Sequence, residues 1–249
     1  MATIYAGTSG WAYSSWKPGF YPAKLASTKF LEYYSGRLNT VEVNYTFQHF
    51  PTKTLLQDWV AATPTEFKFA VKAHQIITHM KRLRGARRLT GRFISSLEPL
   101  LKAKKLGPIL FQLPPFLKCD LTLLKDFLAG LPRETRAAFE FRNTSWFTDE
   151  VYALLHRANV ALCLAESEKI ETPHVHTADF SYLRLRNDAY PARIRKELTR
   201  RIRSLVRRGD VFVYFKHNDT PEGALYAEAL LAGCKRVQGL APHPSFFRQ

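Results

Sequence analysis

Eight short strand-like segments, nearly all separated by helix-like segments, constrain the fold of this chain more than any other sequence feature. The strand-like segments are rich in apolar residues, and they cover Ile4–Ala6, Thr40–Phe47, Phe67–Lys72, Gly107–Leu113, Ala137–Phe141, Val160–Ala165, Tyr182–Leu185 and Val211–Phe215. Alternation of strands with helices implies parallel pairing through right-handed crossovers. Eight such units in 249 residues predict a (β/α)8 barrel, the TIM-barrel fold.

The helix-like segments carry apolar residues at helical spacing, and they cover Ser27–Leu38, Thr52–Ala62, about Phe93–Lys105, Leu121–Leu131, Glu150–Ala158, Ala192–Arg208 and Ala224–Ala232. The connection Glu166–Phe180 is weakly helical, so the repeat is expected to be irregular between the sixth and seventh strands. A doubly wound open sheet is the competing fold, but no G-x-G-x-x-G follows the first strand. No linker divides the chain, which predicts one domain over residues 1–249.

The segment Thr40–Phe47 alternates strictly between apolar and polar residues. Its apolar face carries Val41, Val43, Tyr45 and Phe47, and its polar face carries Glu42, Asn44 and Thr46. A solvated edge strand can carry such a polar row. Other predicted strands repeat the pattern, however, which favours polar faces that point together into a barrel.

The charge balance favours an anionic partner. The chain has 37 Lys and Arg against 21 Asp and Glu, a formal net charge of +16, which suits nucleic acid or an anionic substrate. Its three cysteines are far apart and form no C-x-x-C, as expected in a reducing compartment. The N-terminal residues do not resemble a signal peptide, and no apolar run approaches the ~20 residues that cross a bilayer. We therefore expect a cytoplasmic protein without a membrane partner.

Several motifs together resemble one known family. They are G-T-S-G-W-A-Y and W-K-P-G-F-Y-P within Gly7–Pro22, V-E-V-N-Y-T-F at Val41–Phe47, F-K-F-A-V-K at Phe67–Lys72, I-T-H at Ile77–His79, F-Q-L-P-P at Phe111–Pro115, F-E-F-R-N-x-S-W at Phe139–Trp146 and the region Tyr214–Asp219. Across nearly the whole chain this combination resembles the YecE-like family, a domain of unknown function (DUF72). The resemblance implies a TIM-barrel fold and supplies no reaction.

Active sites of such barrels lie at the C-terminal ends of the strands. If the more apolar face of each strand points outward, polar side chains point inward near that end: Glu42, Asn44, Lys72, Gln112, Glu140, Arg142, Glu166, Arg184, Arg186, Lys216 and Asn218. Ser9 and Trp11 join them from the loop after the first strand, and Trp146 from the loop after the fifth. We expect a ligand pocket here. The alternative is a buried ion network, with Glu42 and Glu140 paired to Arg142 or Arg184, that only fills the lumen.

Five cationic side chains against three carboxylates predict an anionic ligand in this pocket, because guanidinium groups bind phosphate and carboxylate in pairs of hydrogen bonds. Glu42 or Glu140 would act as general base, and Lys72 would stabilise developing negative charge. The leading hypothesis is therefore a hydrolase-like enzyme on phosphate esters. A glycosidase is a minor alternative, with Trp11 and Trp146 stacking on sugar rings, but so many cations oppose a raised carboxyl pKa.

Metal chemistry has little support in the motifs. There is no H-E-x-x-H, and the weak candidates for a divalent metal are His79 and Asp219. The motifs therefore identify no cofactor, and a divalent metal is one possibility.

A basic segment, Lys81–Arg92, carries six cations after the third strand, on the expected active face. We expect an irregular loop there, able to hold a phosphate backbone at the barrel mouth. This gives the second hypothesis, a non-catalytic nucleic-acid-binding protein that uses the barrel mouth and the Lys81–Arg92 loop.

Overall fold

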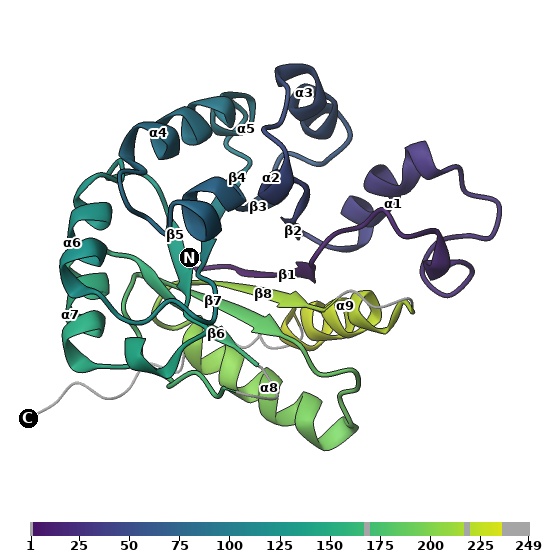
Figure 1. Cartoon of the computed structure of the whole chain (residues 1–249). Helices are drawn as coiled ribbons and strands as arrows, with labels where there is room; N and C mark the ends of the chain where they lie inside the picture. The colour runs from purple at the N-terminus through teal and green to yellow at the C-terminus, as the bar shows by residue number, and fades with distance from the viewer. Residues whose placement is uncertain (1, 167–169, 217–219, 236–249) are drawn as a thin grey trace, which may run out of the picture.

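The computed structural model describes residues 2–166, 170–216 and 220–235, and in them eight parallel strands form one sheet with the order β1-β8-β7-β6-β5-β4-β3-β2. The strands are β1 (Ile4–Thr8), β2 (Thr40–Val43), β3 (Lys68–Lys72), β4 (Leu106–Gln112), β5 (Ala137–Glu140), β6 (Ala161–Ala165), β7 (Phe180–Leu185) and β8 (Asp210–Phe215). Figure 1 shows the helices outside the curved sheet. The predicted (β/α)8 barrel is confirmed.

The helices that cover the sheet are α1 (Phe30–Arg37), α2 (Tyr45–Gln48), α3 (Lys53–Ala61), α4 (Arg87–Ser96), α5 (Glu98–Lys102), α6 (Leu121–Ala129), α7 (Asp149–Arg157), α8 (Ala192–Leu205) and α9 (Glu222–Lys235). Three begin at capping side chains: Thr52, Asp120 and Thr148 each accept a hydrogen bond from a backbone N–H in the first turn of α3, α6 and α7. As expected, the described part of the β6–β7 connection, residues 170–179, contains no helix. No helix among the described residues is long and apolar enough to cross a membrane.

Side chains bridge β1 and β2, which are the two ends of the sheet order. The Asn39 amide accepts from Ala6 N (2.9 Å) and donates to Ile4 O (2.8 Å). The Tyr34 hydroxyl accepts from Thr8 N (2.8 Å) and donates to a β2 carbonyl (3.0 Å). Two side chains thus satisfy backbone groups that a strand ladder would otherwise pair.

Two apolar clusters lie on the two sides of the sheet. The outward cluster packs against the helices and includes Val41, Val43, Phe69, Phe111 and Phe139. The inward cluster fills the lumen with Ala70, Leu110, Ala138, Cys163, Phe180, Tyr182, Phe212 and Tyr214. The predicted outward face of β2 is therefore correct, and its inward residues are Thr40, whose hydroxyl lies 2.9 Å from that of Tyr214, and Glu42.

The predicted strand Thr40–Phe47 is wrong in its second half. The strand ends at Val43, Asn44 adopts a helical backbone conformation, and Tyr45–Gln48 form α2. The Thr46 hydroxyl anchors this turn by donating to Lys72 O at 2.7 Å. Alternation of polarity continues through the segment, but the hydrogen bonds between neighbouring strands stop at Val43.

The basic segment is also more regular than predicted. A π-helical turn covers Ile76–Met80, and α4 begins at Arg87 instead of about Phe93. The predicted helix up to Lys105 is divided into α4 and α5 near Leu97, since Pro99 in the first turn of α5 has no N–H with which to continue α4.

Candidate functional site

The Glu42 carboxylate lies at the centre of a polar cluster at the C-terminal end of the barrel. Its side chain is fully buried. Oε1 accepts hydrogen bonds from Ser9 Oγ (2.8 Å), Arg184 Nη2 (2.9 Å) and Arg186 Nη2 (3.4 Å), and Oε2 accepts from the Tyr182 hydroxyl (2.7 Å). The Ser9 hydroxyl also accepts from Arg186 Nη1 at 3.0 Å. Strands β1, β2 and β7 therefore meet at one carboxylate.

Arg184 joins this carboxylate to a second one. Its Nη1 donates to Glu140 Oε2, whose other oxygen accepts from Gln112 Nε2 at 2.8 Å. Its Nε is buried and has no hydrogen-bond partner within the described part of the chain. One guanidinium thus links β2, β5 and, through Gln112, β4, which is the ion network that the sequence left as an alternative.

Both carboxylates are held in the ionised form. Burial by itself would raise the pKa of Glu42, but Arg184 and Arg186, with hydrogen bonds from Arg184 and Tyr182, outweigh it and hold the pKa well below its usual range. Burial also opposes ionisation of Glu140, and the same two arginines lower the pKa of that carboxyl. Weak basicity and fully occupied oxygens suit Glu42 to positioning the arginines.

Lys72 ends β3 beside this network. Within the described residues its ammonium forms no hydrogen bond or ion pair, and Nζ lies 4.1 Å from the centroid of the Phe47 ring. Burial and the positive charge of Arg184 lower the pKa of Lys72 to about 8, although Glu42 and Glu140 act in the opposite direction. Lys72 is therefore protonated at pH 7 but gives up its proton readily.

His79 contacts the same aromatic residue. Its ring meets Phe47 edge to face with centroids 4.9 Å apart, and its Nδ1 lies 2.9 Å from the Thr78 hydroxyl. Burial, with the charges of Lys72 and Arg142, lowers the pKa of His79. Because this pKa lies below its usual value of 6.5, the neutral form of His79 predominates at pH 7, so a proton donor and a proton acceptor contact one aromatic ring.

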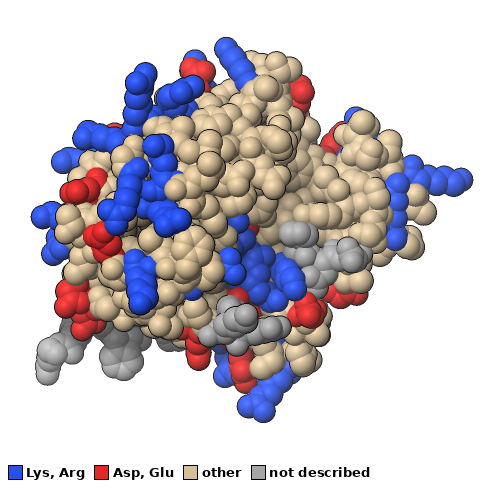
Figure 2. Space-filling view, in the orientation of Figure 1, with Lys and Arg blue, Asp and Glu red and all other residues tan. Residues whose placement is uncertain are grey.

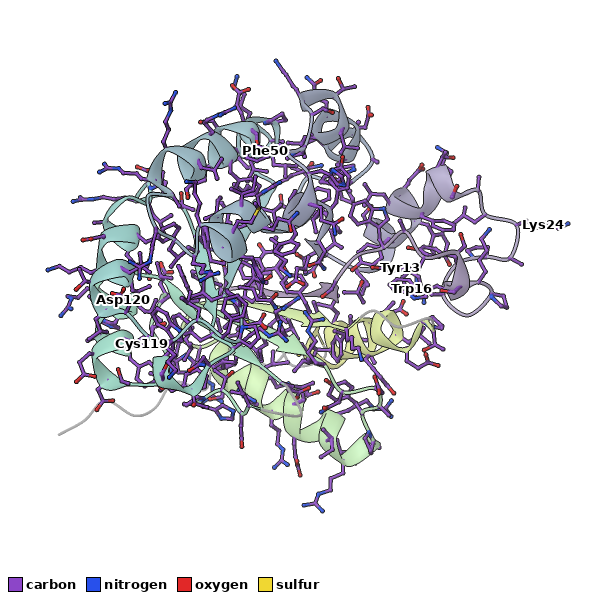
Figure 3. All side chains as sticks on the ribbon, viewed as in Figure 1. Tyr13, Trp16, Lys24, Phe50, Cys119 and Asp120 are labelled. Carbon is purple, nitrogen blue, oxygen red and sulfur yellow. The ribbon has the colours of Figure 1, made fainter. Side chains whose placement is uncertain are left out.

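The remaining predicted ligand-binding residues have varied surroundings. Asn44 and Trp11 are half-buried, with the Trp11 ring edge-on to Trp59 at 5.3 Å, and Arg142 is exposed. Lys216 pairs with Asp188 at 3.0 Å. The aromatic loop after β1 stands to one side of the barrel, where Figure 3 shows Tyr13 and Trp16 close together.

Trp146 lies in the core next to β5. Its side chain is fully buried, its ring stacks on Phe141 at 4.7 Å, and its indole N–H donates to Leu117 O. Its ring therefore has no open face for a ligand in this conformation. Asn218 and Asp219 lie outside the described residues.

No group of three or more His, Cys, Asp or Glu side chains in the described ranges is arranged to hold a metal ion. The candidate metal ligand His79 therefore has no such partners among these residues. Its contacts are with Thr78 and Phe47.

Sequence reasoning missed Tyr182 and the role of Phe47. The pattern Y-L-R-L-R places Tyr182 on the same strand face as Arg184, so the period of two contained the signal for Tyr182. A strand that continues past Val43 predicts an outward position for Phe47. The helical turn of α2 instead brings it to Lys72.

Fold and site together define a (β/α)8-barrel protein with charged side chains at the C-terminal ends of its strands. The family profile described as "Protein of unknown function DUF72" matches residues 5–245, so the chain belongs to this family. That membership confirms the resemblance seen in the motifs.

Relatives support the same assignment. The UPF0759 protein YunF of Bacillus subtilis (strain 168) is 34% identical over 159 residues, which cover 60% of this chain and 54% of YunF. A DUF72 family protein of Thermotoga maritima has a similar crystal structure, with a TM-score of 0.83, 25% identity and coverage of 94% of this chain and 99% of that one. The crystal structure of a DUF72 family protein of Enterococcus faecalis is also similar, with a TM-score of 0.72, 19% identity and coverage of 93% of this chain and 98% of that one.

Proposed function

We propose that this protein is a hydrolase-like enzyme that acts on a phosphate ester, in a phosphorylated small molecule or in nucleic acid. The observation that carries the proposal is the pair Lys72 and His79, which contact the same Phe47 ring at the mouth of the barrel. Opposed protonation states in one site are the usual arrangement for an acid and a base. The C-terminal end of β3 is also where such barrels carry their catalytic groups.

The charges favour an anionic ligand. The carboxylates of Glu42 and Glu140 are balanced by the guanidinium groups of Arg184 and Arg186. Lys72 and Arg142 have no such acidic partner in the described ranges, so the site keeps an excess of positive charge. A phosphoryl group would compensate that excess.

The proposed reaction consumes one water. Neutral His79 accepts a proton as the water oxygen bonds to phosphorus, and the ester P–O bond breaks on the opposite side. The leaving oxygen takes the proton of the Lys72 ammonium. Positive charge nearby stabilises the phosphoryl oxygens as bonding changes. Proton exchange with solvent then restores both side chains.

The two carboxylates have supporting roles in this scheme. Glu42 and Glu140 hold the arginines and, because the pKa values of both carboxyls are lowered, neither suits the proton donor that glycoside hydrolysis requires. A phosphate ester therefore fits the site better than a glycoside.

The pH dependence of turnover tests the proposal. We expect hydrolysis of p-nitrophenyl phosphate or bis(p-nitrophenyl) phosphate to follow a bell-shaped profile, rising as His79 loses its proton below pH 6.5 and falling near pH 8 as Lys72 loses its own. Lys72→Gln should lower kcat by about 10²–10⁴-fold and remove the limb near pH 8. His79→Gln should remove the acid limb.

Lys68→Gln is the matched control. Lys68 begins the same strand, four residues before Lys72 and on the same face, and its ammonium donates a hydrogen bond to Lys104 O at the opposite end of the barrel. Lys68→Gln should leave kcat within about twofold of the value for the unchanged protein. Unchanged turnover in Lys72→Gln, or an equal loss in Lys68→Gln, would contradict the proposal.

A further inference from the structure

Three exposed apolar side chains lie in the segments that follow three adjacent strands at the barrel mouth. Tyr45, Met80 and Phe116 are 46%, 68% and 62% exposed, and they follow the C-terminal ends of β2, β3 and β4. Together with Arg82 we call these residues the rim platform. Large exposed apolar side chains that lie together commonly mark a binding surface.

Arg82 and Phe116 connect two of these segments. The Arg82 guanidinium lies over the Phe116 ring, 5.0 Å from its centroid. The backbone at Arg82 and Leu83 is in the left-handed region, with φ of 49° and 70°, a conformation that is uncommon for residues other than glycine and asparagine. Leu83 is buried and its N–H donates to Ile77 O at 3.0 Å, so core packing holds Arg82 in place. One face of the Phe116 ring is thus covered by a cation, and the side chain keeps a large exposed area.

The rim platform is continuous with the proposed catalytic pair. Met80 directly follows His79 in the π-helical turn, and His79 contacts Phe47, which covers Lys72. Tyr45 lies in α2 with Phe47, two residues before it, and its ring stacks on His49 at 4.8 Å. A chain molecule lying on the rim would therefore reach the site at Lys72.

The platform has a positive border at Lys81, Arg82 and Arg84, and the cations continue into α4, where Arg87 lies beside Gly130 at the C-terminal end of α6. The segment Lys81–Arg92 contains six cations and no acidic residue, and all six side chains are exposed: Lys81, Arg82, Arg84, Arg87, Arg88 and Arg92. Arg84 pairs with Asp120, labelled in Figure 3 at the start of α6. Figure 2 shows Lys and Arg side chains gathered around the α4 side of this face. Apolar rings beside a row of cations match a polyanion with flat apolar groups.

We propose that the rim platform binds single-stranded nucleic acid. Bases stack on Phe116 and Tyr45, and phosphates lie along the cations of Lys81–Arg92. A stacked single strand presents both features, because its bases are exposed and its backbone carries one charge per nucleotide. A duplex hides its base faces, and an acidic peptide lacks them. The inference deepens the proposed function, on which it rests for the reaction, by placing a phosphodiester of the bound strand at Lys72.

Fluorescence anisotropy tests the binding. A labelled mixed-sequence strand of about 12 nucleotides should bind the full chain more tightly than the same sequence as a duplex. The logarithm of the association constant should fall linearly with the logarithm of salt concentration. Polyglutamate of similar total charge should displace the labelled single strand from the protein only weakly. Equal affinity for strand, duplex and polyglutamate would overturn the inference, because the surface would then recognise charge alone.

Substitutions separate stacking from charge. Phe116→Ala should weaken binding of the single strand by about 5- to 150-fold, and Phe116→Trp should preserve it. Leu101→Ala is the apolar control, since Leu101 is 47% exposed on α5, at the opposite end of the barrel. It should leave affinity unchanged. An equal loss in both alanine variants, or none in Phe116→Ala, overturns the stacking role.

Arg82→Ala should weaken binding of the single strand. It should also reduce, by about 0.7, the steepness with which the logarithm of the association constant falls with the logarithm of salt concentration. Arg207→Ala makes the same change of charge beyond the C-terminal end of α8, far from the mouth, and should leave the slope unchanged. If the salt dependence of binding were the same in Arg82→Ala and Arg207→Ala, the nucleic acid would not bind at Arg82.

The outcomes also separate this inference from the proposed function. Lys72-dependent turnover of a small phosphate ester without single-strand binding would overturn the inference and leave the proposed function standing. Single-strand binding that depends on Phe116, with no turnover of any phosphate ester, would support the rim platform and overturn the hydrolase.

Discussion

The Glu42→Gln substitution tests the central ion network most directly. The change keeps the size of the side chain and removes its negative charge. Arg184 would keep Glu140 as its acidic partner, but Arg186 would lose its only ion pair in the described part of the chain. The new amide would also turn an N–H₂ group toward donors from Ser9, Arg184 or Tyr182.

The loss of stability should be large because the Glu42 side chain is fully buried. Removing one partner of a buried ion pair costs about 3–5 kcal/mol, since the remaining charge stays buried without compensation. The Arg37–Glu228 pair is a suitable control, with exposed fractions of 27% and 37% for its two side chains. Glu228→Gln should therefore cost only about 0–1 kcal/mol.

Urea unfolding at pH 7 measures both values, provided that the slope with urea is the same in all three proteins. The difference between the variants should be at least about 2 kcal/mol. If Glu42→Gln were no more destabilising than Glu228→Gln, Glu42 would not be the acid that holds the arginines. The roles assigned here to the two carboxylates would then be wrong.

Two further predictions concern stability. A Cβ on Gly7 would lie 2.0 Å from Thr40 O, so Gly7→Ala should lower the free energy of unfolding by at least about 2 kcal/mol. A Cβ on Gly36 in α1 meets nothing within 4 Å, so Gly36→Ala should raise the free energy of unfolding by about 0.5–1 kcal/mol. Urea titrations of the two variants and the unchanged protein measure both values. Acid should also destabilise the fold. The pKa values of Glu42 and Glu140 are lowered on folding, so their stabilisation is fully present above about pH 4.3 and is lost progressively as pH falls from there toward the folded-state values. Thermal unfolding from pH 6 to pH 3 should show a smaller loss in Glu42→Gln, and equal losses would contradict this assignment.

Much of the site was predictable because a strand directs alternate side chains to opposite faces. Glu42, Gln112, Glu140 and Arg184 all lie on inward faces as predicted, and they meet through hydrogen bonds. Parallel strands place their C-terminal ends at one end of a barrel, so residues distant in sequence converge there. The alternation of side chains along each strand and the position of a residue near the C-terminal end of its strand were therefore sufficient to find the cluster.

The same reasoning failed where backbone pairing, and not polarity, decides the structure. Alternation continues past Val43, but the chain turns into α2 and brings Phe47 to Lys72. Cations in Lys81–Arg92 suggested a loop, yet core packing of Leu83 and the start of α4 give the segment a defined form. No local pattern encodes these contacts.

The sequence by itself determined the (β/α)8 order, the inward faces that carry Glu42, Gln112, Glu140 and Arg184, and the excess of positive charge. The prediction that Glu166 points inward is wrong: it follows β6 on the outward side with Leu162 and Leu164, and its Oε2 accepts from Arg186 N (3.1 Å) and from the Tyr190 hydroxyl. Tertiary structure decided which charges neutralise one another. Arg184 binds Glu42 and Glu140 from strands far apart in sequence, and Lys72 is left without an acidic partner in the described ranges. The physical reason is that pairing and pKa depend on distance and burial, which arise only when the barrel closes.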